Sequence, residues 1–348
     1  NDFMQLPVLT NDSDTASGAA APGSHPPLRD QFGRGIGYLR LSLTKACAMR
    51  CLYCRPALLD QPRDEPQLAA DEIESLVRHL AKRHGLSKVR LTGGDPTSRR
   101  DFTDILARVA RVRGIEDLAI TTNGLTLHRR AREYADAGLK RLNISLDTLD
   151  PERFAMLTGV DQLSRVIEGI DTAKKVGLDP IKLNTVVVRD RNETDLPSLV
   201  QFAAGRGLEA RFIELMPMGP LAEKWAERYV PEFAIWRSLH SIIRETQPLT
   251  QGSDAARRYR VRLHDDRWVT VGVITPMSCN FCASCNRIRI AADGTLYPCL
   301  MDEPADSLLP ALRPFDGDLV DRYLAKGLAG KRAEHPHDGV ATMTHIGG

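Results

Sequence analysis

Short apolar stretches alternate with longer amphipathic stretches over most of the chain. Apolar residues recur at helical spacing over 71–84, which predicts a helix that ends at Gly85. Further helices are predicted near 101–112, 126–137, 162–176 and 194–204, and strands at 38–43, 88–92, 118–122, 139–146, 181–188 and 209–215. This alternation favours an α/β fold with a parallel sheet, and these six strands are too few to close a full barrel. We therefore predict an open, partial β/α barrel, with a doubly wound sheet as the alternative that the pattern allows.

The pattern changes near residue 216. Residues 216–256 are irregular with some helix, RRYRVRL and WVTVGVIT predict a hairpin, and RIRIAADGTLYPCL predicts another across Asp293 and Gly294. Residues 1–31 are rich in Asp, Ser, Ala, Gly and Pro, which predicts a disordered leader. We therefore divide the chain into this leader, a partial barrel over 32–216, a C-terminal α+β extension over 217–335, and a flexible tail over 336–348.

Composition narrows the possible partners and location. The 348 residues include 47 basic and 45 acidic ones, so a net charge of +2 gives no reason to expect a nucleic-acid binder. No apolar run approaches the roughly 18–20 residues of a membrane span, and the first thirty residues lack the layout of a signal peptide. Seven cysteines, an odd and clustered number, favour metal ligation in a reducing compartment over disulfides. We predict a cytoplasmic protein without a membrane partner.

Basic residues interrupt four of the six predicted strands, where a parallel sheet is expected to be apolar. They are Arg40, Arg90, Lys182 and Arg211. Each of them alone could pair with a carboxylate or lie at a strand end, but four that point into one cavity predict an anionic ligand such as a phosphate chain. Arg287 and Arg289 share one face of a later strand and could join them. Polar groups at comparable strand positions are Thr121, Asn143, Ser145 and Asn184.

Two groups of cysteines carry the candidate metal chemistry. CAMRCLYC (47–54) directly follows the first strand, and three soft thiolates there favour an iron–sulfur cluster or zinc. Three ligands leave a fourth position open for a substrate, whereas a structural zinc site would borrow a fourth ligand. The second group, CNFCASC (279–285), is followed at once by NRIR, and Cys299 lies further on.

The first cysteine group and LTGGDP (91–96) resemble the radical S-adenosylmethionine (SAM) superfamily. The resemblance implies a 4Fe–4S cluster on Cys47, Cys51 and Cys54 that binds SAM at its open iron and yields a 5′-deoxyadenosyl radical. It also implies that Tyr53 lies against the adenine, and that Gly93, Gly94 and Asp95 meet the methionine amino group. Asp95 replaces the usual Glu and is one methylene shorter.

Further motifs resemble the GTP 3′,8-cyclases of molybdenum-cofactor biosynthesis (the MoaA type). These are LRLSLT (39–44), RLTGGDPTSRRDF (90–102), TTNG (121–124), NISLDTL (143–149), KLNTVVVRDRN (182–192), RFIELMPMG (211–219), C-x2-C-x13-C with NRIR, and the terminal Gly-Gly. The resemblance runs from about Phe32 to Gly348 and is weak over 220–275.

This second resemblance implies the remaining site residues. A second 4Fe–4S cluster would bind Cys282, Cys285 and Cys299, with an open iron facing the guanine of GTP. Contacts with GTP are implied for Arg40, Arg90, Thr121, Lys182, Arg211, Arg287, Ile288 and Arg289, and contacts with SAM for Gly94, Ser145 and Met216. Catalytic roles are implied for Arg287, Arg289 and the tail residues Gly347 and Gly348, although a frayed terminus is the simpler reading of the tail. Cys279 lies outside the matched motif and is predicted not to be a ligand.

The implied reaction converts GTP to 3′,8-cyclo-7,8-dihydro-GTP. The implied partners are GTP, an external electron donor, a second copy in a homodimer, and the next enzyme of the pathway, cyclic pyranopterin monophosphate synthase. Two alternatives remain: a two-cluster radical SAM enzyme that modifies peptides or sulfatases, and a zinc-bearing binding module on an α/β scaffold. The basic strand residues favour a triphosphate over a peptide.

Overall fold

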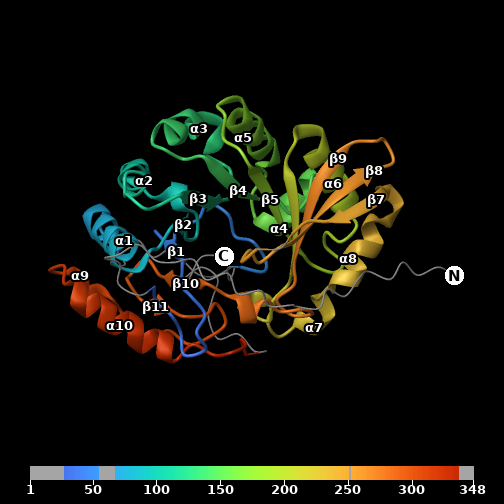
Figure 1. Ribbon diagram of the computed structural model, residues 1–348. Coiled ribbons are helices and arrows are strands. Elements are labelled where there is room, and N and C mark those ends of the chain that lie inside the picture. The colour runs from blue at the N-terminus through green and yellow to red at the C-terminus, as the bar shows by residue number, and fades with distance from the viewer. Residues whose placement is uncertain (1–26, 55–66, 251, 337–348) are drawn as a thin grey trace.

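The structure is a computed structural model that describes residues 27–54, 67–250 and 252–336. Its centre is a run of six parallel strands: β1 (Tyr38–Ser42), β2 (Lys88–Thr92), β3 (Asp117–Thr122), β4 (Arg141–Ser145), β5 (Ile181–Val187) and β6 (Glu209–Glu214). The helices on the outer side of this arc are α1 (Ala70–His84), α2 (Phe102–Ala110), α3 (Leu127–Asp136), α5 (Leu163–Lys175) and α6 (Leu196–Arg206) (Figure 1). The predicted open β/α barrel is therefore confirmed.

One helix between the six barrel strands was not predicted. α4 (Pro151–Thr158) lies between β4 and α5, and the Asp150 side chain accepts a hydrogen bond from the Arg153 N–H at its start. Pro151 follows in the first turn and Gly159 ends the helix in the left-handed conformation. The helix is only 8 residues long, too short for apolar periodicity to stand out, although its capping residues are a readable signal.

The C-terminal segment extends the same sheet at both edges. β9 (Trp268–Ile274) pairs in parallel with β6 and is followed outward by antiparallel β8 (Arg257–Leu263) and β7 (Ile243–Pro248). At the other edge, β10 (Arg287–Ile290) pairs in parallel with β1, and β11 (Leu296–Tyr297) pairs antiparallel with β10. Both predicted hairpins are confirmed, but the sequence did not predict that they would flank the barrel strands on opposite sides.

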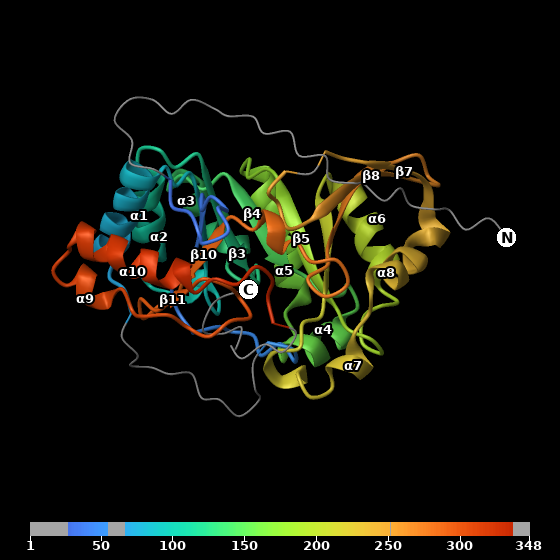
Figure 2. The same ribbon diagram turned by 60° about the horizontal axis from the view of Figure 1, so that its bottom comes forward.

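Short helices complete the C-terminal segment and the connections. They are α7 (Trp225–Arg228), α8 (Glu232–Leu239), α9 (Leu309–Leu312), α10 (Gly317–Ala329) and the single turns η1 (Pro96–Ser98), η2 (Gly219–Leu221), η3 (His240–Ile242) and η4 (Cys282–Ser284). α10 lies beside α1 in both ribbon views (Figures 1 and 2). No helix among the described residues is both long and apolar enough to cross a membrane.

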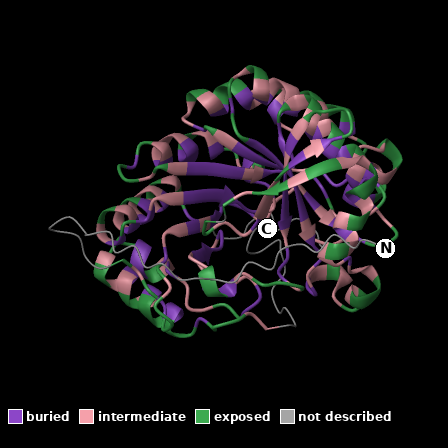
Figure 3. Cartoon of the chain, turned by 45° about the vertical axis from the view of Figure 1, so that its right-hand side comes forward, coloured by how far each residue is buried: buried purple, intermediate pink, exposed green. Residues whose placement is uncertain are grey.

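The two faces of the sheet differ in polarity because successive side chains point to opposite sides. On the outer face, under the helices, the central strands carry buried apolar residues such as Leu41, Leu91, Ile144 and Phe212. Figure 3 shows these strands buried and the outward helix surfaces exposed. The basic residues and the polar residues flagged in the sequence occupy the opposite positions, so they share the inner face.

Some described residues belong to the predicted leader. Residues 27–31 include the buried Asp30, which pairs with Arg34, and Gln31, whose side-chain amide donates to the Lys331 carbonyl over 2.9 Å. The folded part of the chain thus begins before residue 32. The remainder of the leader, 1–26, and most of the predicted tail, 337–348, lie outside the described residues.

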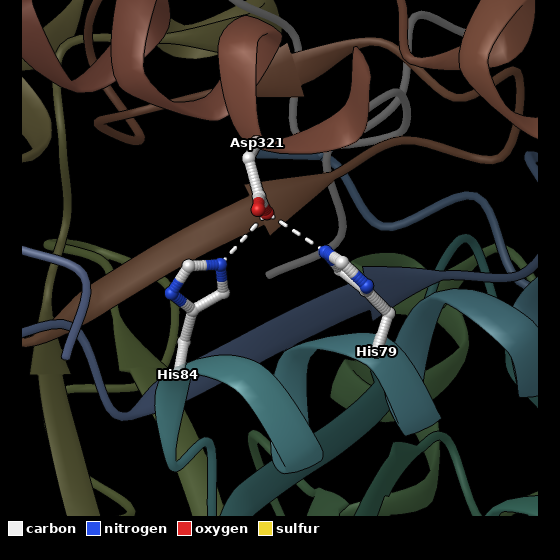
Figure 4. Close-up of side chains that lie close together, drawn as sticks. All are labelled: His79, His84 and Asp321. Atoms are coloured by element: carbon white, nitrogen blue, oxygen red, sulfur yellow. Dashed lines mark hydrogen bonds and ion pairs between the residues drawn. The ribbon is translucent and has the colours of Figure 1, made fainter. Parts of the chain in front are cut away.

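A cluster of two histidines and a carboxylate joins α1 to α10. Asp321 Oδ1 accepts hydrogen bonds from Nε2 of His79 (2.8 Å) and of His84 (2.7 Å) (Figure 4). Asp321 Oδ2 pairs with Arg83 Nε (2.7 Å). These residue types can bind a metal, but Arg83 already neutralises the carboxylate. His84 Nδ1 is buried without a partner among the described residues, whereas a metal-bound imidazole normally donates from its other nitrogen. We therefore interpret this cluster, the histidine lock, as a structural link.

Candidate active site

The first cysteine loop, 43–54, follows β1 and is supported by α4. The backbone N–H groups of Arg50 and Leu52 donate to the carbonyls of Thr158 (2.7 Å) and Leu157 (2.9 Å), at the end of α4. Asn123 Nδ2 donates to Cys47 Sγ over 3.6 Å. The backbone thus presents the three cysteines on a loop that is held from both sides.

Two glycines allow the loop after β2 to lie directly against this cysteine loop. The N–H groups of Gly94 and Asp95 donate to the carbonyls of Thr44 (2.7 Å) and Ala46 (2.8 Å). A Cβ atom on Gly93 would lie 2.4 Å from the Thr44 oxygen, and one on Gly94 would lie 2.5 Å from the Ala46 oxygen. No larger residue fits, so GGDP has a structural role in placing the cysteine loop.

The Asp95 carboxylate points into the protein, unlike the ligand contact that the resemblance implied. It is 1% exposed and accepts four hydrogen bonds, two at each oxygen, from Thr97, Thr122 and the Asn123 N–H. Its short side chain caps η1, and this local geometry explains the inward direction. Burial raises the pKa of Asp95, although these hydrogen bonds oppose the shift. The ligand role of Asp95 stays a prediction.

Tyr53 is also held by a buried carboxylate. Its hydroxyl donates to Asp147 Oδ2 over 2.7 Å, and the Val186 N–H donates to Asp147 Oδ1 over 2.9 Å. Burial raises the pKa of Asp147 to about 6, against the opposing effect of these hydrogen bonds. The remaining residues predicted to contact SAM, Ser145 at the end of β4 and Met216 after β6, are both half-buried.

The β10–β11 hairpin brings the second cysteine trio together. Cys282 and Cys285 lie in and beside η4, just before β10. Arg289 pairs with Tyr297 across the hairpin, so the same register continued by two residues sets Cys299 opposite Arg287. This explains how 13 intervening residues in the motif return the third cysteine to the first two. Cys279 is exposed and its sulfur accepts a hydrogen bond from Arg257 over 3.5 Å.

Each cysteine trio brings three thiols into one neighbourhood. The thiols of Cys51 and Cys282 interact electrostatically with the other two members of their trios. Soft thiolates are ligands of iron–sulfur clusters and of zinc, and a structural zinc site takes four protein ligands. Three thiolates therefore suit a 4Fe–4S cluster that keeps one iron open.

A row of arginines crosses the inner face beside the second trio. Arg40 lies in register with Arg289 of β10 on one side and with Arg90 of β2 on the other. Arg287 lies two residues before Arg289 on β10, and its guanidinium lies 5.0 Å from the centre of the Phe281 ring. Burial and the neighbouring Arg287 lower the pKa of Arg289 to about 10, so it remains charged at neutral pH. Adjacent like charges repel, which favours an anion between them.

The second pair of basic residues has acidic neighbours. Arg211 Nε pairs with Glu209, and Lys182 Nζ lies 3.9 Å from the same carboxylate. Burial, together with Arg211, lowers the pKa of Lys182 to about 8. Asp254 Oδ2 also lies 3.9 Å from Arg211 Nη2. The simpler interpretation, that strand cations pair with carboxylates, therefore holds for Lys182 and Arg211.

Polar atoms on the inner face also lack partners. Arg90 Nε, Ser42 Oγ, Thr121 Oγ1 and Asn184 Oδ1 are buried and make no hydrogen bond within the described part of the chain. Such groups are costly to bury unless a ligand or water satisfies them. They lie on β1, β2, β3 and β5, along the same face as the arginine row. This face has the chemistry of a site for a polar anion.

The predicted role of Ile288 is limited by the burial of its side chain. The Ile288 side chain is completely buried in the core on the outer face, so a contact with a ligand could come only from its backbone. Gly347 and Gly348 lie outside the described residues, and their predicted catalytic role stays a prediction.

Sequence reasoning missed Glu214, the residue that holds the loop before the second trio. It is 1% exposed and accepts hydrogen bonds from the N–H groups of Met277 (3.1 Å) and Ser278 (3.0 Å), and from the Tyr229 hydroxyl (2.9 Å). The available signal was a carboxylate at the carboxyl end of a strand that should be apolar.

Comparisons with known proteins agree with both resemblances. Residues 41–203 match the radical SAM superfamily, and residues 208–337 match Molybdenum Cofactor Synthesis C. A GTP 3′,8-cyclase of Pelotomaculum thermopropionicum is 41% identical over 290 residues, which cover 82% of this chain and 88% of the relative. The GTP 3′,8-cyclase of Alkaliphilus metalliredigens is 36% identical over 329 residues, which cover 92% of this chain and all of the relative.

A solved structure supports the fold alone. The crystal structure of Streptococcus suis SuiB bound to precursor peptide SuiA matches with a TM-score of 0.59 at 17% identity, covering 86% of this chain and 67% of that chain. The family resemblance drawn from the motifs is confirmed by the relatives and by both family matches. The chain belongs to the GTP 3′,8-cyclase family, with a radical SAM region followed by a Molybdenum Cofactor Synthesis C region.

Proposed function

We propose that this chain is a radical SAM GTP 3′,8-cyclase, a lyase that converts GTP to 3′,8-cyclo-7,8-dihydro-GTP at the start of molybdenum-cofactor biosynthesis. Membership of the family supports the activity. The structural observation that carries the proposal is the row formed by Arg289, Arg40 and Arg90 on adjacent strands. This row offers positive charge to a triphosphate. It lies beside the second cysteine trio, and its member Arg40 is on β1, the strand that leads into the first cysteine loop.

The radical SAM family supplies SAM and a 4Fe–4S cluster as cofactors. We assign this cluster to Cys47, Cys51 and Cys54, whose loop is held by α4 and by GGDP. When bound, SAM and the cluster supply the 5′-deoxyadenosyl radical that removes the 3′ hydrogen of GTP. A second 4Fe–4S cluster on Cys282, Cys285 and Cys299 is part of the proposal, and the β10–β11 hairpin, which returns Cys299 toward the two cysteines at η4, supports it.

The residues of the chain bind, orient and shield the substrate. Arg40, Arg90 and Arg289 would hold the triphosphate, and Arg287 would lie between it and the second trio. Fixing the ribose relative to the radical source removes the entropy cost of finding the reactive geometry. The buried strand positions exclude water, which strengthens each charged contact. Carbon 3′ then bonds to carbon 8 of guanine, and an external electron donor with a proton completes the reduction.

Further partners are proposed on family grounds. These are a homodimer and hand-off of the product to cyclic pyranopterin monophosphate synthase. We also propose a reducing, cytoplasmic setting, because the described residues form no disulfide.

The deciding experiment follows one hydrogen atom. The reconstituted protein is incubated without oxygen with SAM, a reductant and GTP deuterated at carbon 3′. We expect deuterium in 5′-deoxyadenosine and a cyclised product with the mass of a GTP isomer. Cleavage of SAM with unchanged GTP would refute the substrate assignment and favour the peptide-modifying alternative.

Metal analysis of the same preparation separates the classes of protein. We expect about eight iron per chain when two clusters are full. A colourless protein with stoichiometric zinc would instead support the binding-module alternative.

A further inference from the structure

Lys331 is a buried lysine that no motif singled out. It directly follows α10 and Gly330 and is only 2% exposed. A buried ammonium must donate its hydrogen bonds within the protein. Its Nζ donates to the Arg287 carbonyl over 2.8 Å and also to the Pro298 carbonyl.

The two carbonyls lie at the two ends of the β10–β11 hairpin. Arg287 is two residues after Cys285, and Pro298 directly precedes Cys299. Lys331 therefore links the two chain segments that supply the second cysteine trio. The ammonium of Lys331 therefore lies between the segments that carry Cys285 and Cys299.

The residues that follow Lys331 reach Cys282, the remaining member of the trio. The His335 backbone N–H donates to the Cys282 thiol, and the His335 ring Nε2 lies 2.7 Å from the Pro276 carbonyl. Arg34 Nη1 donates to both the Cys282 and Ala333 carbonyls, each over 2.8 Å. Residues 331–335, which we call the C-terminal brace, thus bind the backbone near Cys285 and Cys299 and the thiol of Cys282.

The position of the brace depends on α10, which the histidine lock joins to α1. The lock lies at Asp321 within α10, and the helix ends at Ala329, two residues before Lys331. A helix anchored to the barrel thus delivers the lysine to the hairpin.

We propose that Lys331 is a positioning residue for a cluster on Cys282, Cys285 and Cys299. It holds the hairpin at the spacing the three thiolates need and sets one buried positive charge beside them. This inference rests on the second cluster of the proposed function. A nearby cation stabilises the more negative, reduced state, so Lys331 would raise the reduction potential of that cluster.

The test isolates the second cluster. In a full-length variant in which Cys47, Cys51 and Cys54 are all replaced by Ser, the iron content per chain measures only the iron bound by the second trio. We expect about four iron per chain in this variant after anaerobic reconstitution. Adding Lys331→Met should lower the iron content at least twofold and make the midpoint potential of the remaining cluster more negative. Lys326→Met is the matched control, because Lys326 lies on α10, is 74% exposed and pairs only with Asp306 among the ion pairs described.

Each outcome bears on a different claim. Unchanged iron and unchanged potential in Lys331→Met would overturn the positioning role while leaving the second cluster intact. An iron-free triple-Ser variant would overturn the second cluster itself, and the inference with it. In otherwise unmodified protein, Lys331→Met should keep the iron of the first cluster and its SAM binding. Loss of both would mean that Lys331 supports the whole fold, which contradicts a local role.

Discussion

At the scale of single residues, buried cations on the inner face fall into two groups. Lys182 and Arg211 share the carboxylate of Glu209. Arg289 instead lies beside Arg40 and Arg287, and its pKa of about 10 keeps it charged at neutral pH. The sequence could suggest the Arg211–Glu209 pair, two residues apart on one strand, but the alignment of Arg289 with Arg40 depends on which strands become neighbours.

Arg289→Ala should weaken GTP binding roughly 10- to 100-fold, the effect of losing a buried hydrogen bond between charged groups. Equilibrium binding of GTP under anaerobic conditions measures this loss. Both clusters should assemble, because Arg289 contributes no thiolate.

The matched control is Arg244→Ala, since Arg244 is 55% exposed and pairs with Asp266 at the sheet edge. Its GTP affinity should stay unchanged. Loss of iron in Arg289→Ala would contradict a role confined to the nucleotide.

At the scale of elements, close contact between loops decides where the first cysteines lie. The loop after β2 can approach the cysteine loop only because residues 93 and 94 have no side chain. The sequence suggested these glycines through a resemblance, and the structure adds the reason: the two loops share backbone hydrogen bonds at Thr44 and Ala46.

Gly94→Ala should displace the first cysteine loop, because the new Cβ would lie 2.5 Å from two backbone oxygens. Iron content should fall from about eight toward about four per chain, with SAM binding lost. Gly35→Ala is the control, since a Cβ atom at that position would have no other atom within 4 Å. Full iron content in Gly94→Ala would show that the loop tolerates the displacement.

At the scale of the whole molecule, segments distant in sequence complete one sheet and one site. β10 comes from the C-terminal segment but lies directly against β1, which aligns Arg289 with Arg40. α10 packs beside α1 through the histidine lock (Figures 1 and 4). Strand patterns could predict the hairpins, whereas their placement at opposite edges depends on packing across the whole sheet.

Asp321→Asn should destabilise the cluster-free protein, and the loss should depend on pH. Burial raises the pKa of Asp321, but hydrogen bonds from His84 and His79 lower it by more, to below its ordinary value. A depressed carboxyl pKa stabilises the fold above the unfolded pKa of about 4, and this stabilisation is lost as pH falls through the folded pKa.

Thermal unfolding of both proteins measures the difference in melting temperature. We expect it to be fully developed above about pH 5 and to shrink as pH falls below about 4. Asp318→Asn, at a 77% exposed position of the same helix, should show little change. A difference independent of pH would contradict the ionised role of Asp321.

The amino-acid sequence by itself determined the strand–helix alternation, the two hairpins and the two cysteine motifs. These features depend on local periodicity, turn residues and short spacing, which a single chain segment carries. Tertiary structure decided which polar groups remain available to a ligand. Asp95, Glu209 and Lys331 are each buried and paired within the protein. Asp95 accepts from Thr122, Glu209 lies beside Lys182, and Lys331 donates to Arg287, so each has at least one partner distant in sequence. The free energy of burying each charge therefore depends on neighbours that the local sequence does not specify.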